Sequence, residues 1–263
     1  MSSERDLRES TLGLKDQHEI FGLKAEFEAE GSRFDDLVVF AGIAHRADLS
    51  LVIKIGGCEA VSDLHLARLL SADKIVAPMI ESTFALQKFA NTMETIYGAD
   101  HQNWPKALFN VETVTALSII DDLVSACSDL GLDGIVVGRG DLAQSMGLAR
   151  SGVEDPAVLK ATRRSLEAAR EKGLICGFGG GVTTATVPNL LQLATDGLVD
   201  YFETRKVLIR ATGTSTHQTL RKSVLTALQI ELLWLESKRE LYLDIVTEDD
   251  QRMERLAAAL EQS

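Results

Sequence analysis

The chain has 263 residues, of which 45% are hydrophobic and 5% aromatic, and its formal net charge is −12. Nucleic-acid binding requires a basic face, and this acidic chain contains no basic cluster, so that class of function is excluded. No apolar run is long enough for a signal peptide or a membrane span, and we expect a cytoplasmic protein that has no membrane partner.

Short β-like runs alternate with helical runs along most of the chain. Strands are expected at residues 21–27, 50–55, 73–80, 106–112, 133–138, 174–178 and 200–205. Helices are expected between them, near residues 34–47, 59–71, 82–97, 113–130, 155–172 and 184–196. Alternation of this kind predicts a parallel sheet with helices packed outside it.

A single α/β barrel fits both this alternation and the length of the chain. We therefore predict a TIM (β/α)8-type barrel over residues 1–213, with residues 1–18 as an N-terminal extension. Only seven β/α units can be counted, so either residues 1–18 supply a short strand or the barrel is irregular. A doubly wound open sheet is the alternative fold.

The tail of the chain, residues 214–263, has a different pattern. A long helix is expected over residues 214–241, because apolar residues recur there at helical spacing, namely Leu220, Val224, Leu228, Leu232 and Leu235. A second helix is expected near residues 249–260. We predict that these C-terminal helices pack either on the barrel or on a partner subunit, in at least a dimer.

Charged residues and glycines follow nearly every predicted strand. In an α/β barrel the catalytic groups lie at the carboxyl ends of the strands, so these residues are the candidates for a site. In chain order they are Glu28 and Glu30, Lys54, Glu81, Glu112, Gly138, Arg139 and Asp141, Gly180, and finally Glu203 and Arg205. Each one could also be a solvated residue at the start of a loop.

Crowded carboxylates at one rim repel each other unless a cation is bound. Oxygen ligands without a nearby His or Cys pattern favour a hard ion, Mg²⁺ or Mn²⁺. Glu112 and Asp141 each stand where a strand passes into its loop. We predict these two carboxylates as the metal ligands. Lys24, Glu26 and Glu28 alternate along the first strand and share one face, which predicts an internal Lys24–Glu26 ion pair.

The order and spacing of two motifs carry a family resemblance. FNVET at residues 109–113, followed by LDGIVVGRGDLAQSMG at residues 132–147, resembles the HpcH/HpaI aldolase and citrate lyase family over roughly residues 20–210. DKIVAPMIES at residues 73–82 resembles a strand of that family. The resemblance implies a TIM barrel that binds Mg²⁺ or Mn²⁺ at Glu112 and Asp141. It further implies oligomers with exchanged C-terminal helices, and a pyruvate-like α-keto acid, its enolate or an acyl enolate as substrate.

The chain departs from the family pattern at two positions. Gly31 stands where the family carries a catalytic His, and Lys54 stands where it carries an Arg that polarises the keto oxygen. Glu30 or Glu81 is therefore expected to replace the His as general base. Lys54 is expected to hold or polarise the substrate, and the remaining substrate-binding candidates are Gly138, Arg139, Gly180 and Arg205.

The predicted function is a metal-dependent carbon–carbon lyase or aldolase that acts on an α-keto acid or enolate. Two alternatives remain open. One is a non-catalytic family member, or one with an altered reaction, that still binds metal and a keto acid. The other is an aldolase in which Lys54 forms a Schiff base with the substrate.

Overall fold

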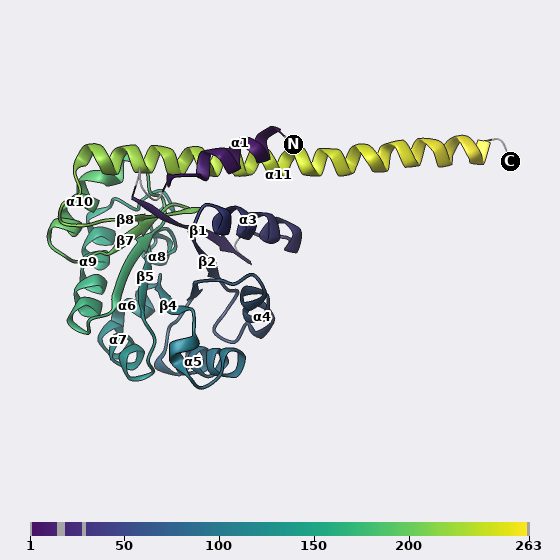
Figure 1. The fold of residues 1–263 in the computed structure, drawn as a ribbon. Coiled ribbons are helices and arrows are strands. Elements are labelled where there is room, and N and C mark those ends of the chain that lie inside the picture. The colour runs from purple at the N-terminus through teal and green to yellow at the C-terminus, as the bar shows by residue number, and fades with distance from the viewer. Residues whose placement is uncertain (1, 15–18, 28–29, 262–263) are drawn as a thin grey trace.

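A computed structural model describes residues 2–14, 19–27 and 30–261 of the chain. Among these residues, consecutive strands pair from β1 to β8 and close into a barrel. The strands are β1 (Ile20–Glu26), β2 (Ser50–Lys54), β3 (Lys74–Ala77), β4 (Lys106–Val111), β5 (Gly134–Gly138), β6 (Ile175–Gly179), β7 (Tyr201–Glu203) and β8 (Val207–Arg210). Helices surround the barrel (Figure 1), so the predicted α/β barrel is confirmed.

The outer helices follow the strands in the predicted alternation. They are α3 (Phe34–Arg46), α4 (Val61–Leu69), α5 (Thr83–Tyr97), α6 (Val114–Ser118), α7 (Ile120–Asp129), α8 (Arg139–Ser145), α9 (Pro156–Glu171) and α10 (Val187–Thr195). Short 3₁₀ turns lie at His101–Asn103 and Thr184–Thr186. Several helices begin at a capping side chain that accepts a backbone N–H, as Ser82 does from Ala85 and Thr113 does from Ala116. Such caps satisfy N–H groups that the helix itself leaves free.

The strands are buried on both faces, as parallel strands covered by helices should be. Inside the barrel, aliphatic side chains from neighbouring strands form a packed layer of Val52, Val76, Leu108, Val136 and Leu208. At the amino-terminal ends of the strands, an aspartate that precedes one strand accepts the N–H of a residue on the neighbouring strand. Asp73 bonds to Leu51 in this way at 2.7 Å, and Asp133 bonds to Ala107 at 2.8 Å.

The eighth strand makes the barrel irregular. β8 follows β7 after a three-residue turn, and it runs antiparallel to both β7 and β1. The side chain of Thr204 holds this turn by accepting the N–H of Val207 at 3.2 Å. Of the two possibilities predicted for the missing unit, the irregular barrel is the one observed, because the described part of residues 1–18 forms α1 (Ser2–Thr11) and no strand.

The tail is one continuous helix, α11 (His217–Glu261), so the prediction of two separate helices was wrong. Neither glycine nor proline occurs between residues 217 and 261, and nothing local therefore ends the first helix. One stripe of α11 packs on the barrel and on α1, and its buried apolar members are Leu220, Val224, Ala227, Ile230 and Trp234. The second half extends past the barrel (Figure 1).

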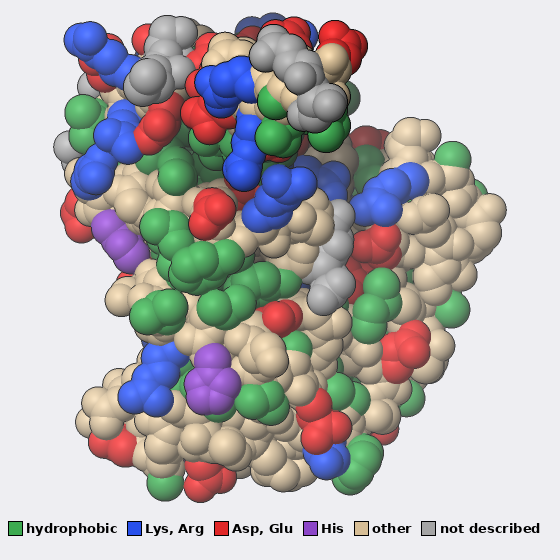
Figure 2. Space-filling view, turned by 90° about the vertical axis from the view of Figure 1, so that its right-hand side faces the viewer, with side chains coloured by type: hydrophobic (Ala, Val, Ile, Leu, Met, Phe, Trp, Pro, Cys, Tyr) green, Lys and Arg blue, Asp and Glu red, His purple; other side chains and the backbone are tan. Residues whose placement is uncertain are grey.

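The surface seen from the free end of α11 mixes apolar and charged side chains (Figure 2). Exposed apolar residues occur on α3, at Phe34 and Val38, and on α4, at Val61 and Leu69. No helix among the described residues combines the length and the hydropathy that a membrane crossing requires.

Candidate active site

A cavity of about 440 Å³ opens at the carboxyl ends of the strands, in the mouth of the barrel. Barrel enzymes place their chemistry at this face. Side chains from at least five strands or strand ends contribute to it, and the charged and polar ones are Lys24, Glu26, Lys54, Asn110, Glu112, Asp141, Arg150, Ser151, Glu203, Thr204 and Arg205. The residues expected at the rim that meet at this one cavity are Lys54, Glu112, Gly138, Asp141, Gly180, Glu203 and Arg205.

Glu112 is fixed at the end of β4 by donors on both carboxylate oxygens. Its Oε1 accepts the N–H of Met79 at 2.9 Å, and its Oε2 accepts from Asn110 Nδ2 at 2.8 Å. Lys54 Nζ also lies 3.3 Å from Oε2. Gly138 on β5 leaves the space for this carboxylate, because a Cβ at that position would come within 2.7 Å of Oε2.

Asp141 lies in the first turn of α8 and faces the same cavity. Its Oδ1 is 3.3 Å from the Arg150 guanidinium, which comes from the loop after α8 and is largely exposed. Each of the two predicted metal ligands therefore has one cation beside it, Lys54 for Glu112 and Arg150 for Asp141. These cations compensate the negative charge that the carboxylates bring to the rim.

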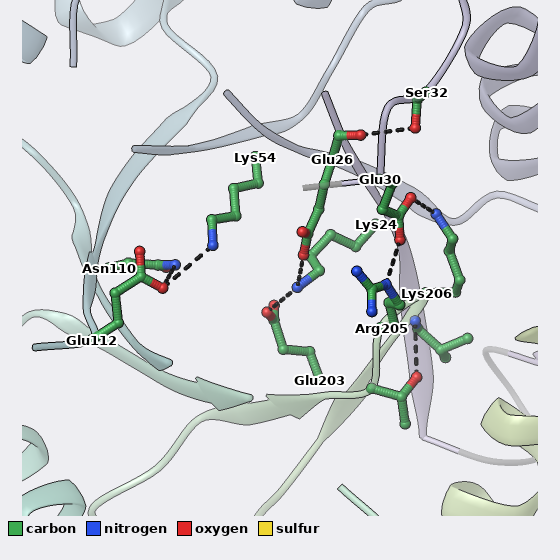
Figure 3. A network of polar contacts seen from close by, with 12 residues as sticks. Lys24, Glu26, Glu30, Ser32, Lys54, Asn110, Glu112, Glu203, Arg205 and Lys206 are labelled. Atoms are coloured by element: carbon green, nitrogen blue, oxygen red, sulfur yellow. Dashed lines mark hydrogen bonds and ion pairs between the residues drawn. The ribbon is translucent and has the colours of Figure 1, made fainter. Parts of the chain in front are cut away.

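Deeper in the mouth, Lys24 lies between two glutamates (Figure 3). Its Nζ is 3.0 Å from Glu26 Oε1, which confirms the predicted ion pair, and it also donates to Glu203 Oε1. Burial disfavours charge on Lys24, but Glu203 and Glu26 outweigh that effect and raise its pKa above the ordinary value. Burial likewise opposes ionisation of Glu26, and the charges of Lys24 and Lys54 overcome it, lowering the pKa of Glu26 to about 2.

The two carboxylate oxygens of Glu203 have different surroundings. Its Oε1 is held by Lys24, whereas its buried Oε2 has no hydrogen-bond partner among the residues described. Gly179 makes room for this side chain, since a Cβ there would come within 2.8 Å of Glu203 Cγ. A buried acceptor without a partner is costly in a finished core, and the Glu203 side chain lies at the edge of the cavity.

Glu30, which we expected to act as a base, is held in ion pairs beside the site. Its carboxylate contacts Arg205 Nε at 3.0 Å and the ammonium of Lys206 (Figure 3). Lys206 is buried over the Phe40 ring, and this burial lowers its pKa despite the partnership with Glu30. Glu30 is not among the residues that line the cavity. Glu28 lies outside the described residues.

Arg139 and Glu81 also lie away from the cavity. The Arg139 guanidinium is buried, stacks 4.8 Å from the centre of the Phe178 ring and pairs with Glu154 at 3.0 Å. It also donates to the carbonyl oxygen of Gly180 at 3.0 Å, so it fastens the loop after β6 to the start of α8. Glu81 is exposed in the loop that precedes α5. Neither side chain is placed to contact a ligand in the barrel mouth.

Gly180 allows the loop after β6 to approach α8 closely. Its φ of +88° is a conformation that glycine adopts readily, and a Cβ there would come within 2.5 Å of the Gly140 amide nitrogen. The backbone therefore lines the cavity directly at this point. Any side chain at residue 180 would push the loop away from the Asp141 turn.

The family model for HpcH/HpaI aldolase/citrate lyase matches residues 44–183, which is more than half of the chain. The chain belongs to the HpcH/HpaI aldolase/citrate lyase family. The matched region spans β2 to β6 and contains Lys54, Glu112, Asp141 and Gly180. Glu26, Glu203 and the long helix α11 lie outside it.

Solved structures of HpcH/HpaI proteins share the fold. An HpcH/HpaI aldolase/citrate lyase family protein from Burkholderia cenocepacia J2315 matches with a TM-score of 0.63 and 16% identity, over 94% of this chain and 91% of that one. An HpcH/HpaI aldolase from Desulfitobacterium hafniense DCB-2 matches with a TM-score of 0.57 and 15% identity, over 69% and 75% of the two chains. No curated protein matches the sequence.

Two features of this HpcH/HpaI site could not be found from motifs. Arg150 lies in an irregular loop nine residues after Asp141, and only the fold of α8 and of that loop brings the two together. Glu203 was predicted as a strand end, but the pairing of its Oε1 depends on Lys24, a residue 179 positions away in the sequence. The alternation of charged residues on β1 was the only sequence signal for this network, and it predicted the Lys24–Glu26 ion pair without Glu203.

Proposed function

We propose that this family member is a divalent-metal-dependent carbon–carbon lyase of the aldolase or citrate lyase type, acting on an α-keto acid or its enolate. The observation that carries the proposal is that Glu112 and Asp141 line one cavity together with the ammonium of Lys54. The family is one of aldolases and citrate lyases, and the pair of carboxylates lies at the face where barrels carry out catalysis.

The donor set suits a small hard cation. Mg²⁺ is commonly held by one or two carboxylates and keeps water on its other positions. Within the described residues, no group of three or more His, Cys, Asp or Glu side chains could hold a metal ion, so the ion would rest on Glu112 and Asp141 and leave positions for substrate oxygens. Bound there, it would supply Lewis acidity toward a carbonyl and a carboxylate oxygen.

The cations of the cavity account for recognition of the substrate. Lys54 and Arg150 now lie beside the two carboxylates, and Arg205 lines the same mouth. If a divalent ion were bound by Glu112 and Asp141, it would neutralise their negative charge. Lys54 and Arg150 would then be available to bind the carboxylate of a keto acid. A guanidinium can bind a carboxylate through two parallel hydrogen bonds, whereas Lys54 provides a compact charge without that fork.

Glu203 is our candidate for the proton-transfer group. When a carbon–carbon bond next to a carbonyl is cleaved, the carbon left behind must gain a proton, and condensation must remove one. Glu30 and Glu81 do not line the cavity, and a pKa of about 2 makes Glu26 a weak base. Glu203 lines the cavity, Lys24 fixes its Oε1, and its buried Oε2 has no hydrogen-bond partner among the described residues.

The test uses NMR to monitor whether the protein, with Mg²⁺ in deuterated water, exchanges the protons next to the keto group for deuterium. A panel of α-keto acids serves as substrates. We expect exchange with the wild-type protein, loss of exchange in Glu112→Gln and Asp141→Asn, and loss without a change in metal affinity in Glu203→Gln. Glu59→Gln, which changes an exposed glutamate paired with Lys88, is the control. If the wild-type protein binds metal and a keto acid but exchanges no proton, the proposal of a lyase is wrong and the non-catalytic alternative holds.

A further inference from the structure

The outward face of α11 carries a strict seven-residue repeat. From Leu225 onward, the repeat advances by three and then by four residues. Its apolar members are one tyrosine and eight Leu, Val or Met residues, namely Leu225, Leu228, Leu232, Leu235, Tyr242, Val246, Met253, Leu256 and Leu260. The two polar positions in the series are Arg239 and Asp249. We call these positions, from 225 to 260, the seam. A repeat of 3.5 residues held over five heptads is typical of a helix in a left-handed coiled coil.

The seam differs from the stripe that packs on the barrel. Barrel-facing residues such as Val224 and Trp234 are buried, whereas the seam residues Leu232 and Leu235 are 55% and 50% exposed. Every residue from 243 to 261 is exposed. At Tyr242 the seam still contacts the barrel, because the Tyr242 hydroxyl donates to Asp36 at 2.6 Å and its ring lies 4.7 Å from the Arg33 guanidinium. Beyond Tyr242 the yellow end of α11 extends away from the other described elements (Figure 1).

We propose that the seam pairs with the seam of a second copy of this chain in an antiparallel coiled coil. The two polar positions decide the direction. In a parallel pair, each arginine at residue 239 would face the same arginine, and each Asp249 would face the other Asp249. In an antiparallel pair centred on residue 244, Arg239 of each chain faces Asp249 of the other. Like charges in a seam repel, and opposite charges attract.

The antiparallel register also pairs apolar residues at the other seam positions from 228 to 260. With Arg239 opposite Asp249, Leu235 faces Met253, Leu232 faces Leu256 and Leu228 faces Leu260 of the second copy. Tyr242, opposite Val246, already contacts Asp36 and Arg33 of its own chain. Apolar residues at the alternating seam positions are what interlocking helices bury. Flanking like charges approach each other in both directions, Glu231 and Glu236 in a parallel pair, and Glu236 with Asp250 and Lys238 with Arg252 in an antiparallel one. Exposed charges of that kind contribute little.

The first experiment measures mass by light scattering on full-length protein. We expect at least twice the chain mass of 28.6 kDa. Leu256→Glu lies in the extended half, where no barrel contact is lost, and it should at least halve the measured mass while circular dichroism stays unchanged. Leu241→Glu is the matched control, since Leu241 is exposed on the same helix but lies outside the seam. A wild-type monomer, or equal effects of the two variants, would overturn the proposal.

The second experiment tests the direction. Under mild oxidation, the double variant Leu235→Cys/Met253→Cys should form covalent dimers, and Leu235→Cys alone should form no more than the parent with its native cysteines. Residues 235 and 253 of one helix lie about 27 Å apart, so a bond between them must join two chains. Efficient cross-linking of the single Leu235→Cys variant would indicate a parallel pair and contradict the proposal.

A charge swap gives an independent check of the same register. Arg239→Asp should weaken the association at least about tenfold, which corresponds to about 1.4 kcal/mol, because it places two aspartates opposite each other. Adding Asp249→Arg should restore the wild-type association. If the double variant associates no better than the single one, the two positions do not face each other. The outcome does not depend on the lyase activity, so it is separate from the test of the proposed function.

Discussion

Lys54 Nζ on β2 lies 3.3 Å from Oε2 of Glu112, across the mouth of the barrel. The carboxylate is buried and the lysine is largely so, and the pair therefore interacts more strongly than an exposed ion pair. An ammonium in this place compensates the negative charge of the Glu112 carboxylate. In the proposed function, Lys54 also binds the negatively charged carboxylate of the substrate.

Metal binding should depend on both carboxylates. Glu112→Gln and Asp141→Asn should each weaken Mg²⁺ or Mn²⁺ binding at least about tenfold, or about 1.4 kcal/mol, because each replaces an anionic oxygen ligand by an amide. Titration calorimetry measures the change, with Glu59→Gln as the control. Wild-type affinity in both variants would place the metal elsewhere.

Lys54 should act through its charge and form no bond to the substrate. Its ammonium is engaged with Glu112, and an amine must lose its proton before it can attack a carbonyl. Treatment with borohydride and a keto acid should therefore leave the protein mass unchanged. A reduced adduct located at Lys54 by mass spectrometry would establish the Schiff-base mechanism instead.

The Lys24–Glu26–Glu203 network should make stability depend on pH. The pKa of Glu26 falls from 4.5 to about 2 on folding, so its stabilising contribution is fully present above about pH 4.5 and is lost as the pH falls toward 2. This difference corresponds to roughly 3 kcal/mol, to order of magnitude. Urea unfolding of wild type and Glu26→Gln should show a large gap at pH 7 that narrows below pH 4.5. A gap independent of pH would mean that Glu26 contributes by packing alone.

Arg139 and Arg150 should respond to substitution in opposite ways. Arg139 is buried and ion-paired with Glu154, so Arg139→Met should lower the free energy of unfolding by about 3–5 kcal/mol through the unpaired Glu154 and the lost carbonyl contacts. Arg150 is exposed on the loop beside Asp141, so Arg150→Gln should leave the melting temperature unchanged and weaken binding of keto acids. If Arg139→Met keeps its stability and loses only ligand affinity, Arg139 belongs to the site after all.

Much of the barrel could be predicted because its parallel strands are long apolar runs between helical segments. The end of β3 was set too late, at residue 80, because Pro78 cannot donate to a ladder and Met79 has a φ of +51°. β8 was missed because four residues are too few to form a pattern, and composition does not reveal strand direction. The division of the chain at residue 214 remains a prediction.

The site was predictable where a strand end fixes the direction of a side chain, as at Lys54 and Glu112. It was not predictable where packing decides. Arg139 is two residues before Asp141, yet its side chain turns into the gap between β6 and α9 and is buried there by Phe178 and Glu154. Glu30 was expected to act on the substrate. Instead its carboxylate pairs with Lys206, which lies in the turn between β7 and β8, and this ion pair holds Glu30 beside the cavity.

The reversal of β8 limits the kind of substrate that this rim can hold. Many α/β barrels grip a phosphate group with the loops that follow strands 7 and 8. Here a three-residue turn follows β7, and the chain leaves β8 at the opposite end of the barrel. The usual phosphate cradle therefore has no counterpart on that side of the mouth. The α-keto acid proposed above carries no phosphate group and would not need such a cradle.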